Sequence, residues 1–341
     1  MIYANIHAEG RANNSLFSEE DVVHKYNPSY TPRLMRQEFL RCGVELNTPD
    51  LNYGKKVAFD LYAEGQVLGP RKRPRYLVAM ENPNINKLNS NHEFLRQFDL
   101  VFAWDVRVQH LPNVVSVMIP HSLKSGEFAD FKQRDIFSCL INANKAFKES
   151  LSSDLYLERI KTIRWYERYA PEKFSLFGMG WDKLPPSFTP WGRFKRSITK
   201  ATNYVIGRPA FPSFSGEVDD KAKVLRRTRF SYCYENSRDL KNYITEKIFD
   251  SMTQGCVPVY WGADNILDYI PSDCFIDRRH FSSTQEVHEF LLSVKEGDYV
   301  AYQNSIRDFI HGSQSECFIS IKFIKIIINS ILSNLSQGSL K

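Results

Sequence analysis

The segment 230–262 restricts the possible folds of this chain more than any other part of the sequence. It reads FSYCYENSRDLKNYITEKIFDSMTQGCVPVYWG, and it opens with aromatic residues that alternate with smaller ones, as in a short strand. After a polar turn, Ile244, Ile248 and Met252 recur every four residues and predict the apolar face of a helix. A glycine typical of helix ends follows, and Val257–Trp261 predicts a second strand. Strand, helix and strand in this order predict a parallel sheet covered by helices.

The first turn of this predicted helix contains Lys247, where the positive end of the helix dipole disfavours a cation. The mismatch, about 0.3 kcal/mol or more, disappears if an anion lies against that helix end. Free backbone N–H groups together with a lysine suit a phosphate group. The alternative is an exposed lysine with no binding role, and the residues alone leave both interpretations open.

Length and composition indicate a globular chain with two domains. The 341 residues exceed one ordinary domain and suggest two of about 150 residues each. An apolar content of 43% supports real cores, and a charged content of 25% is ordinary for a soluble protein. The net charge of +6 permits an anionic partner such as a nucleotide or a membrane surface, but it does not indicate nucleic acid.

The cysteines predict neither a zinc site nor a disulfide framework. None of the six forms a close pair in the sequence, and several fall in predicted strands, where a free cysteine behaves as a small apolar residue. This favours a reducing compartment. Residues 1–14 also lack the basic segment and apolar run of a signal peptide or membrane anchor.

Short apolar runs bounded by polar residues recur along the first part of the chain and predict buried parallel strands. These runs are 1–7, 57–62, 76–80, 100–104 and 114–119. The gaps between them are long enough for crossover helices, and 30–46 predicts a helix that runs into a strand. Another apolar run, 137–142, begins a second half. The chain is therefore predicted to be an α/β protein with two Rossmann-like halves.

Several short motifs in and after the segment 230–262 resemble the donor-binding signature of the α1,3-fucosyltransferases, glycosyltransferase family 10. That signature runs aromatic-Glu-Asn-Ser, then Tyr-Val/Ile-Thr-Glu-Lys, then Pro-Val/Ile-x-x-Gly. The matching stretches here are 234–237, 243–247 and 258–262, and the likeness continues at 269–271 and 274–277. Three motifs in the same order are far more specific than one glycine-rich motif. The resemblance extends over most of residues 76–280.

The resemblance implies a GT-B glycosyltransferase, in which two Rossmann-like domains face a cleft that holds the donor. The expected boundaries are 1–130 for an acceptor-side domain, 131–315 for a nucleotide-sugar-binding domain and 316–341 for a helical tail. Animal members of the family carry an N-terminal anchor and stem. Without such a segment, the resemblance implies a bacterial-type cytoplasmic enzyme, with the inner face of the cytoplasmic membrane as a further expected location.

Glu81 directly follows the predicted strand 76–80, at the edge where open α/β sheets place their ligands. From the residues alone, the interpretation of Glu81 as a solvated loop glutamate is at least as well supported as a functional role. The family places its proposed general base just after such a strand, in a Glu-Asn context. Asn82 follows Glu81, so the resemblance implies that Glu81 is the base.

A second helix is predicted from the start signal at 152–154, and Arg159 and Arg164 lie on it. An arginine on a helix is ordinarily solvated. The resemblance implies that an arginine early in this helix reaches the donor diphosphate. Arg159 fits best by its spacing to the later apolar positions, and Arg164 is the alternative.

The resemblance assigns the remaining donor contacts to four residues of the signature. Lys247 would hold the diphosphate together with Arg159, and Glu246 would accept hydrogen bonds from ribose hydroxyls. Tyr243 would pack near the base, and Asn236 would lie near the sugar or phosphate. Direct displacement on a β-linked donor would invert the anomeric centre and give an α-fucoside.

The sequence contains no Asp-x-Asp triplet, the motif that usually carries the divalent ion in metal-using glycosyltransferases. Two cationic side chains and a helix dipole can stabilise a departing diphosphate instead. We therefore expect activity that needs no metal and no other cofactor.

Two segments outside the signature are candidates for contact with a membrane or a lipid-linked glycan. The segment 191–204 interleaves basic and apolar residues, which predicts a basic amphipathic helix or, alternatively, a solvated insertion. The segment 317–332 is dense in isoleucine but too short and interrupted to span a bilayer. We interpret it as a helix packed on the body of the protein, with membrane docking as the alternative.

The expected function is transfer of L-fucose from GDP-fucose to a saccharide hydroxyl. By resemblance the acceptor is N-acetylglucosamine or glucose in a lipopolysaccharide O-antigen or another surface glycan, joined by an α1,3 linkage. One alternative keeps the fold and mechanism with a different nucleotide-sugar donor. Another is a non-catalytic protein that binds a nucleotide sugar, although such a protein has no use for Glu81.

Overall fold

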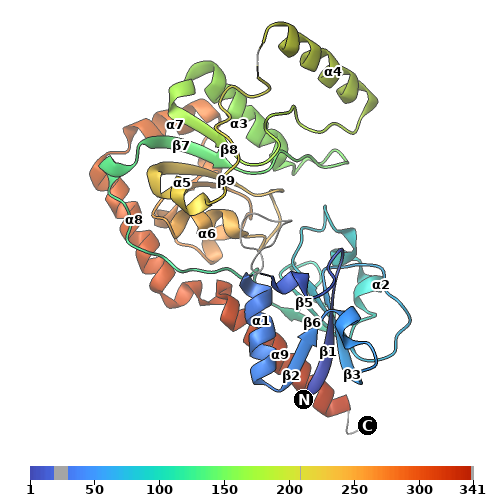
Figure 1. The fold of residues 1–341 in the computed structure, drawn as a ribbon. Helices are drawn as coiled ribbons and strands as arrows, with labels where there is room; N and C mark the ends of the chain where they lie inside the picture. Colours follow the sequence, from blue (N-terminus) through green and yellow to red (C-terminus); the bar gives the residue numbers. More distant parts are fainter. Residues whose placement is uncertain (19–29, 208, 339–341) are drawn as a thin grey trace. The chain divides into compact units, whose positions relative to one another are not determined.

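The computed structural model describes residues 1–18, 30–207 and 209–338. The chain forms two compact units (Figure 1). Unit 1 comprises Met1–Ser122, Lys241–Tyr243 and Ser315–Lys341, and unit 2 comprises Leu123–Leu240 and Ile244–Gln314. The segment expected to be a separate helical tail after residue 315 therefore belongs to unit 1. Lys241–Tyr243, which lie within the segment 230–262, also belong to unit 1, although the residues on both sides of them lie in unit 2.

Unit 1 is built on a six-stranded parallel sheet in the order β2-β1-β3-β4-β5-β6. Its strands are β1 (Ile2–Ala8), β2 (Val44–Asn47), β3 (Val57–Ala63), β4 (Arg75–Ala79), β5 (Leu100–Ala103) and β6 (Val114–Ser116). All five apolar runs predicted as strands are confirmed, and so is the helix running into a strand over 30–46. Because the strands are parallel and β3, β4 and β5 are neighbours, the residues that follow these three strands lie along one edge of the sheet.

The helices of unit 1 are α1 (Tyr30–Arg41), α2 (His92–Leu95) and α9 (Ser320–Gly338). Although the gaps between the strands are long enough for crossover helices, β3 joins β4, and β5 joins β6, without an α-helix. The first of these connections contains Gly69, Pro70 and Pro74, which oppose helix formation.

The helix α9 completes the core of unit 1, which explains the isoleucines near the end of the chain. Its buried apolar residues pack in one cluster with Phe39 of α1, Phe59 of β3 and Tyr76 of β4. They are Phe323, Ile324, Ile327, Ile328 and Ile331. The predicted packing of this segment on the body is confirmed. These buried isoleucines are not available to a membrane.

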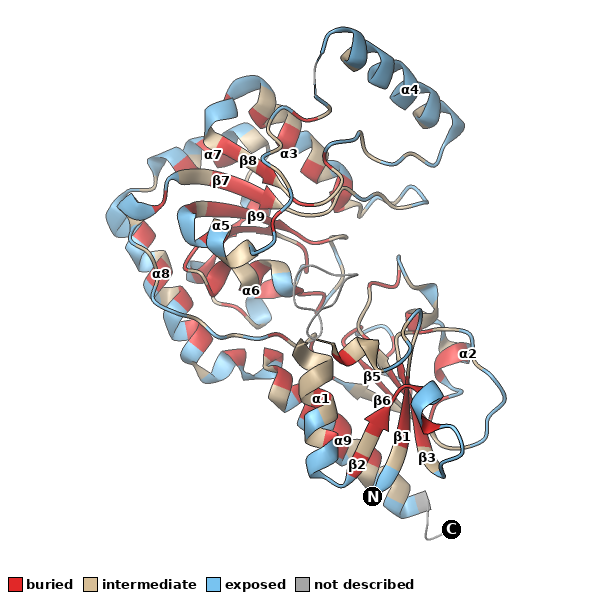
Figure 2. Cartoon of the chain, viewed as in Figure 1, coloured by how far each residue is buried: buried red, intermediate tan, exposed pale blue. Residues whose placement is uncertain are grey.

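Unit 2 contains a five-stranded parallel sheet in the order β11-β10-β9-β7-β8. Its strands are β7 (Ile136–Ile141), β8 (Phe174–Phe177), β9 (Thr228–Tyr234), β10 (Val257–Trp261) and β11 (Ile276–Asp277). Its helices are α3 (Leu155–Tyr169), α4 (Pro190–Val205), α5 (Lys221–Arg227), α6 (Glu246–Met252), α7 (Thr284–Ser293) and α8 (Glu296–His311). The strands are mostly buried, whereas α4 is exposed along its length (Figure 2).

The predicted strand-helix-strand unit is confirmed as β9, α6 and β10, with Tyr234 opposite Trp261 in the parallel register. The helix begins at Glu246, so the buried Ile244 precedes it. Gly255 lies between α6 and β10 with a φ of +65°, and a Cβ there would lie 2.4 Å from Cγ of Phe128. Both the backbone conformation and the close ring therefore require glycine at this position.

Candidate functional site

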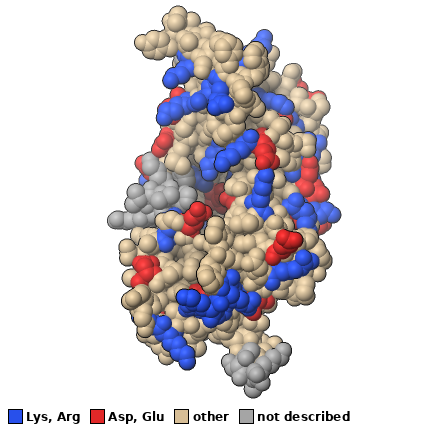
Figure 3. Space-filling view, turned by 90° about the vertical axis from the view of Figure 1, so that its right-hand side faces the viewer, with Lys and Arg blue, Asp and Glu red and all other residues tan. Residues whose placement is uncertain are grey.

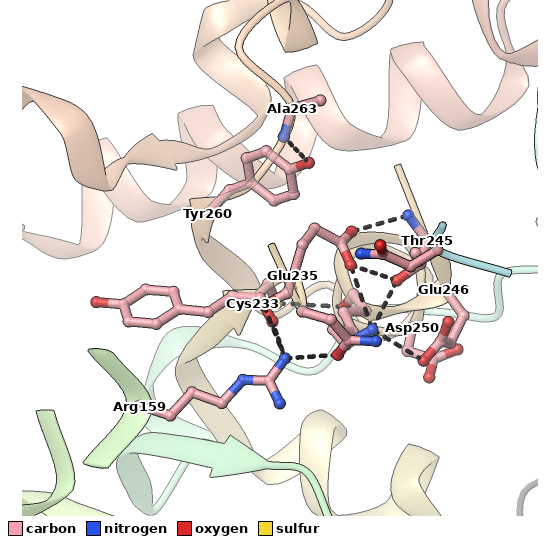
Figure 4. A network of polar contacts seen from close by, with 12 residues as sticks. Arg159, Cys233, Glu235, Thr245, Glu246, Asp250, Tyr260 and Ala263 are labelled. Atoms are coloured by element: carbon pink, nitrogen blue, oxygen red, sulfur yellow. Dashed lines mark hydrogen bonds and ion pairs between the residues drawn. The ribbon is translucent and has the colours of Figure 1, made fainter. Parts of the chain in front are cut away.

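A buried carboxylate lies where β9 ends and α6 begins. The side chain of Glu235 is 0% exposed, and its Oε1 accepts a hydrogen bond from the backbone N–H of Thr245 at 2.8 Å (Figure 4). Its Oε2 accepts from Thr245 Oγ1 at 2.7 Å and from Lys247 Nζ at 3.2 Å. Glu235 thus joins the end of the strand to the start of the helix.

Lys247 is held among oxygen atoms. Its Nζ lies 2.8 Å from Thr245 Oγ1 and 3.5 Å from Glu246 Oε1, in addition to Glu235, and its side chain is 14% exposed. Burial disfavours the charged ammonium, but the carboxylates of Glu235 and Glu246 raise the pKa of Lys247 above its ordinary value. Burial raises the pKa of Glu235 above its ordinary value, although Lys247 acts in the opposite direction.

The lysine in the first turn of α6 therefore has an explanation within the chain. The anion that the helix end calls for is the carboxylate of Glu235, which belongs to the Glu-Asn-Ser motif but carried no role in the sequence analysis. A bound phosphate is not needed to explain why Lys247 occurs there.

Arg159 lies beside the same strand end. It is 2% exposed in α3, whose start is capped by Asp154 through the N–H of Tyr156. Its Nη2 donates to the carbonyl oxygens of Tyr234 at 2.7 Å and Glu235 at 2.8 Å. The same nitrogen lies 3.1 Å from Asn236 Oδ1.

The alternative arginine lies elsewhere. Arg164 forms an ion pair with Glu167, donates to the carbonyl of Ala210 at 2.8 Å and lies over the ring of Phe211. Of the two arginines that the sequence left open, the structure brings Arg159 to the signature.

Four of the five predicted donor-site residues therefore lie in one network in unit 2: Arg159, Asn236, Glu246 and Lys247. Lys247 forms ion pairs with the carboxylates of Glu235 and Glu246, whereas Arg159 donates to backbone carbonyls and to Asn236. An anionic ligand would consequently compete with these carboxylates for Lys247. Glu246 is half-exposed and makes the longest contact of Lys247, so it is the partner that a ligand oxygen could most readily replace.

Tyr243 is not part of this network. It belongs to unit 1, is 2% exposed and packs on the ring of Trp104, with ring centroids 4.9 Å apart. The Nδ2 of the neighbouring Asn242 donates to the carbonyl of Trp104 at 3.2 Å. In this structure the buried ring of Tyr243 contacts Trp104. Its packing near a nucleotide base remains a prediction.

Glu81 lies just after β4 in unit 1, at the edge of the sheet where the sequence predicted it. It is partly buried, and its Oε1 accepts the N–H of Asn82 at 2.8 Å. The preceding residue is fixed by Trp104, whose indole N–H donates to the carbonyl of Met80 at 2.8 Å.

A second carboxylate, Glu64, supports the loop that carries Glu81 and was missed in the sequence. Its oxygens accept from the N–H groups of Met80 and Glu81 at 3.2 and 3.0 Å, and from Asn89 Nδ2 at 2.6 Å. Burial, together with the charge of Glu81, raises the pKa of Glu64 to about 7, although the hydrogen bonds oppose this shift. Glu64 follows β3 just as Glu81 closely follows β4, and this shared position was the available signal.

Other classes of site find little support in the described parts of the chain. Within residues 1–18, 30–207 and 209–338, no group of three or more His, Cys, Asp or Glu side chains is placed to hold a metal ion. No described helix is long and apolar enough to cross a membrane. All six cysteines are free. On the face drawn in Figure 3, basic side chains form separate patches interspersed with acidic ones.

The two parallel sheets covered by helices define the class of protein. A solved α1,3-fucosyltransferase is similar over 97% of this chain and 90% of its own, with 12% identity and a TM-score of 0.52. An alpha-glucosyltransferase solved in complex with UDP is similar over 96% of this chain and 100% of its own, with 12% identity and a TM-score of 0.55. At this level of identity the likeness concerns the fold, which is the GT-B fold of glycosyltransferases.

Part of the sequence matches a known protein family. Residues 201–311 match the model described as "Glycosyltransferase family 10 (fucosyltransferase) C-term". The mouse 4-galactosyl-N-acetylglucosaminide 3-alpha-L-fucosyltransferase 9 is 35% identical over 103 residues. Residues 201–311 are therefore similar to the C-terminal part of glycosyltransferase family 10. The stretch matched to the mouse relative is 28% of this chain and 28% of that protein, so the similarity spans under a third of either.

Proposed function

We propose that this chain transfers L-fucose from GDP-fucose to a hydroxyl group of a saccharide acceptor, with inversion at the anomeric carbon. One observation supports this most directly. The signature residues of the family come together with Arg159 at the carboxyl end of β9, where parallel sheets bind nucleotides. The whole network lies within unit 2.

The proposed reaction is a single displacement. The acceptor oxygen bonds to the anomeric carbon while the bond from that carbon to the diphosphate breaks, and GDP leaves with the bonding electrons. Glu81 takes the proton of the acceptor hydroxyl. Arg159 and Lys247 stabilise the charge that develops on the departing diphosphate, with a phosphate oxygen replacing Glu246 beside Lys247.

The reaction is proposed to need no metal ion, because Arg159 and Lys247 supply positive charge where the leaving group departs. The test is the initial rate in excess EDTA. An unchanged rate supports the proposal, and a rate that is abolished by EDTA and restored by Mn²⁺ refutes it.

The proposed acceptor is N-acetylglucosamine or glucose in a lipopolysaccharide O-antigen or another surface glycan, joined through an α1,3 linkage on the cytoplasmic side. A competing proposal keeps the mechanism but changes the donor to a uridine nucleotide sugar. The observation that favours it is the similar fold of a glucosyltransferase solved with UDP.

Calorimetric titration of the purified chain with GDP, GDP-fucose, GDP-mannose, UDP-galactose and UDP-N-acetylglucosamine separates the two proposals. Binding confined to GDP and GDP-fucose supports fucosyl transfer, whereas preference for a uridine nucleotide excludes it. Arg159 and Arg164, both in α3, give a matched pair of variants. Arg159→Lys should weaken GDP binding at least about tenfold, because the short ammonium cannot reproduce the guanidinium geometry. Arg164→Lys should leave GDP binding unchanged.

A further inference from the structure

The helix α4 stands apart from the packing of unit 2. Thr189 caps its first turn by accepting the N–H of Gly192, and Pro190 is its first residue. Both residues favour the start of a helix at this position. None of its residues is buried, as Figure 2 shows. A helix in a globular protein ordinarily gains most of its stability by burying one face, and α4 buries none.

The apolar side chains of α4 nevertheless fall on one face. Trp191, Phe194, Ile198 and Val205 are spaced three, four and seven residues apart, which places them on the same side of a helix. Their exposed fractions are 66%, 55%, 51% and 82%. The rings of Trp191 and Phe194 stack with centroids 5.6 Å apart, so the face presents one continuous aromatic surface at its start.

The opposite face of α4 is basic. Arg193, Arg196 and Lys200 are spaced three and four residues apart, and the turn of 100° per residue places them roughly opposite the apolar stripe. Lys195 adds a fourth positive charge beside the stripe. No Asp or Glu occurs anywhere between Lys183 and Gly216, so nothing nearby in the sequence offsets these charges.

These two faces together identify the partner. A second copy of α4 could cover the apolar stripe, but the basic face points away from such a contact and would remain without a counter-charge. A bilayer that contains anionic lipid satisfies both faces at once. Aromatic and aliphatic side chains enter the boundary between headgroups and acyl chains, while the long arginine and lysine side chains extend to the phosphates.

We propose that α4 lies in the interface of a membrane rich in anionic lipid, with Trp191, Phe194 and Ile198 inserted and Arg193, Arg196 and Lys200 at the headgroups. This attachment is independent of donor binding, because the network around Glu235 and α4 share no residue. It would hold the chain at a surface that carries lipid-linked saccharides.

The test is co-flotation of the full chain with vesicles, either of phosphatidylcholine alone or of phosphatidylcholine with about a quarter phosphatidylglycerol. The chain should float with the anionic vesicles, less so as salt rises, and poorly with the neutral ones. Replacing Arg193, Arg196 and Lys200 together with Gln should weaken binding about a hundredfold, since each basic residue near an anionic surface contributes about fivefold. The double variant Phe194→Ser/Ile198→Ser should abolish binding.

The matched control is Leu292→Ser on α7, because Leu292 is 53% exposed, close to the 55% of Phe194. It should float as the wild type does. GDP titration of each variant checks that the donor site is intact, and this readout keeps a failure of membrane binding separate from a failure of the proposed reaction. Equal binding to neutral vesicles, no binding to either kind, or unchanged binding of the Phe194→Ser/Ile198→Ser variant would overturn the proposal. Dimerisation through α4 without lipid would do so too.

Discussion

Replacing Lys247 with methionine should destabilise unit 2 strongly. Methionine keeps most of the aliphatic length of lysine but removes the charge that faces Glu235 at 3.2 Å. Glu235 is 0% exposed, so its carboxylate would remain in the interior, where it accepts hydrogen bonds from the backbone N–H and the hydroxyl group of Thr245. Removing one partner of a buried ion pair costs about 3–5 kcal/mol, and we expect Lys247→Met to lose a similar free energy of unfolding.

A double-mutant cycle tests this reasoning. Glu235→Gln keeps an acceptor for Thr245 and leaves Lys247 beside Glu246, so it should cost about 1–3 kcal/mol. The double variant Glu235→Gln/Lys247→Met contains no unpaired buried charge. It should therefore be more stable than Lys247→Met alone, by about 1 kcal/mol or more.

The pH dependence supplies an independent check. Burial raises the pKa of Glu235, and loss of the Lys247 charge should raise that pKa further. The native state of Lys247→Met then binds a proton that the unfolded state releases above about pH 4.3, so its stability should increase as pH falls. The deficit should accordingly be largest near about pH 8 and smaller near about pH 5.5.

The assay is chemical denaturation of the three variants and the wild type, followed by circular dichroism at both pH values. A loss below about 1 kcal/mol for Lys247→Met at the higher pH would refute the reasoning, as would strictly additive effects in the cycle. The outcome also bears on donor binding. A loss of GDP affinity in a Lys247 variant measures contact with the diphosphate only if the β9–α6 junction remains folded.

Three further outcomes are expected. Glu81→Gln should lower turnover about a hundredfold or more while GDP-fucose affinity, measured by calorimetry, stays unchanged. The pKa of Glu64 is raised to about 7 in the native state. The stabilisation that results from its proton is therefore fully present below about pH 4.3 and declines as the pH rises to about 7. Wild-type stability should fall with pH in that window by at most about 1.4 kcal/mol per pH unit more than in Glu64→Gln, as melting curves would reveal. Gly178→Ala should destabilise the protein by about 1–3 kcal/mol or more in thermal melting, because φ is +116° and a Cβ would lie 2.2 Å from the carbonyl oxygen of Asn142.

The parts of the site that the sequence predicted correctly are those encoded by local patterns. Alternating aromatic residues predicted β9, and apolar residues four positions apart predicted α6. An acidic residue in a helix-start signal predicted the beginning of α3. Each pattern acts over a few residues and needs no knowledge of the rest of the chain. The carboxylate of Glu235 could not be placed this way. Its importance depends on complete burial and on partners ten and twelve residues away, which the sequence does not display.

Unit 1 was harder to predict because its particular features depend on distant contacts. The isoleucines of α9 lie more than 250 residues after Phe59, yet they share one core. Glu64 becomes part of the site only because β3 and β4 pair in a register that places its carboxylate against the N–H groups of Met80 and Glu81. Neither relationship has a sequence period that could reveal it.

The signature itself combines both kinds of information, because one short segment serves two packed units. Tyr243 contacts Trp104, which holds the carbonyl of Met80 just before the proposed base, whereas Thr245 and Lys247 bind Glu235. The two sets of contacts are separated by a single residue, the buried Ile244. The Tyr-Ile-Thr-Glu-Lys motif therefore supplies packing contacts within each unit, so its match to the family reflects more than the contacts of a bound nucleotide.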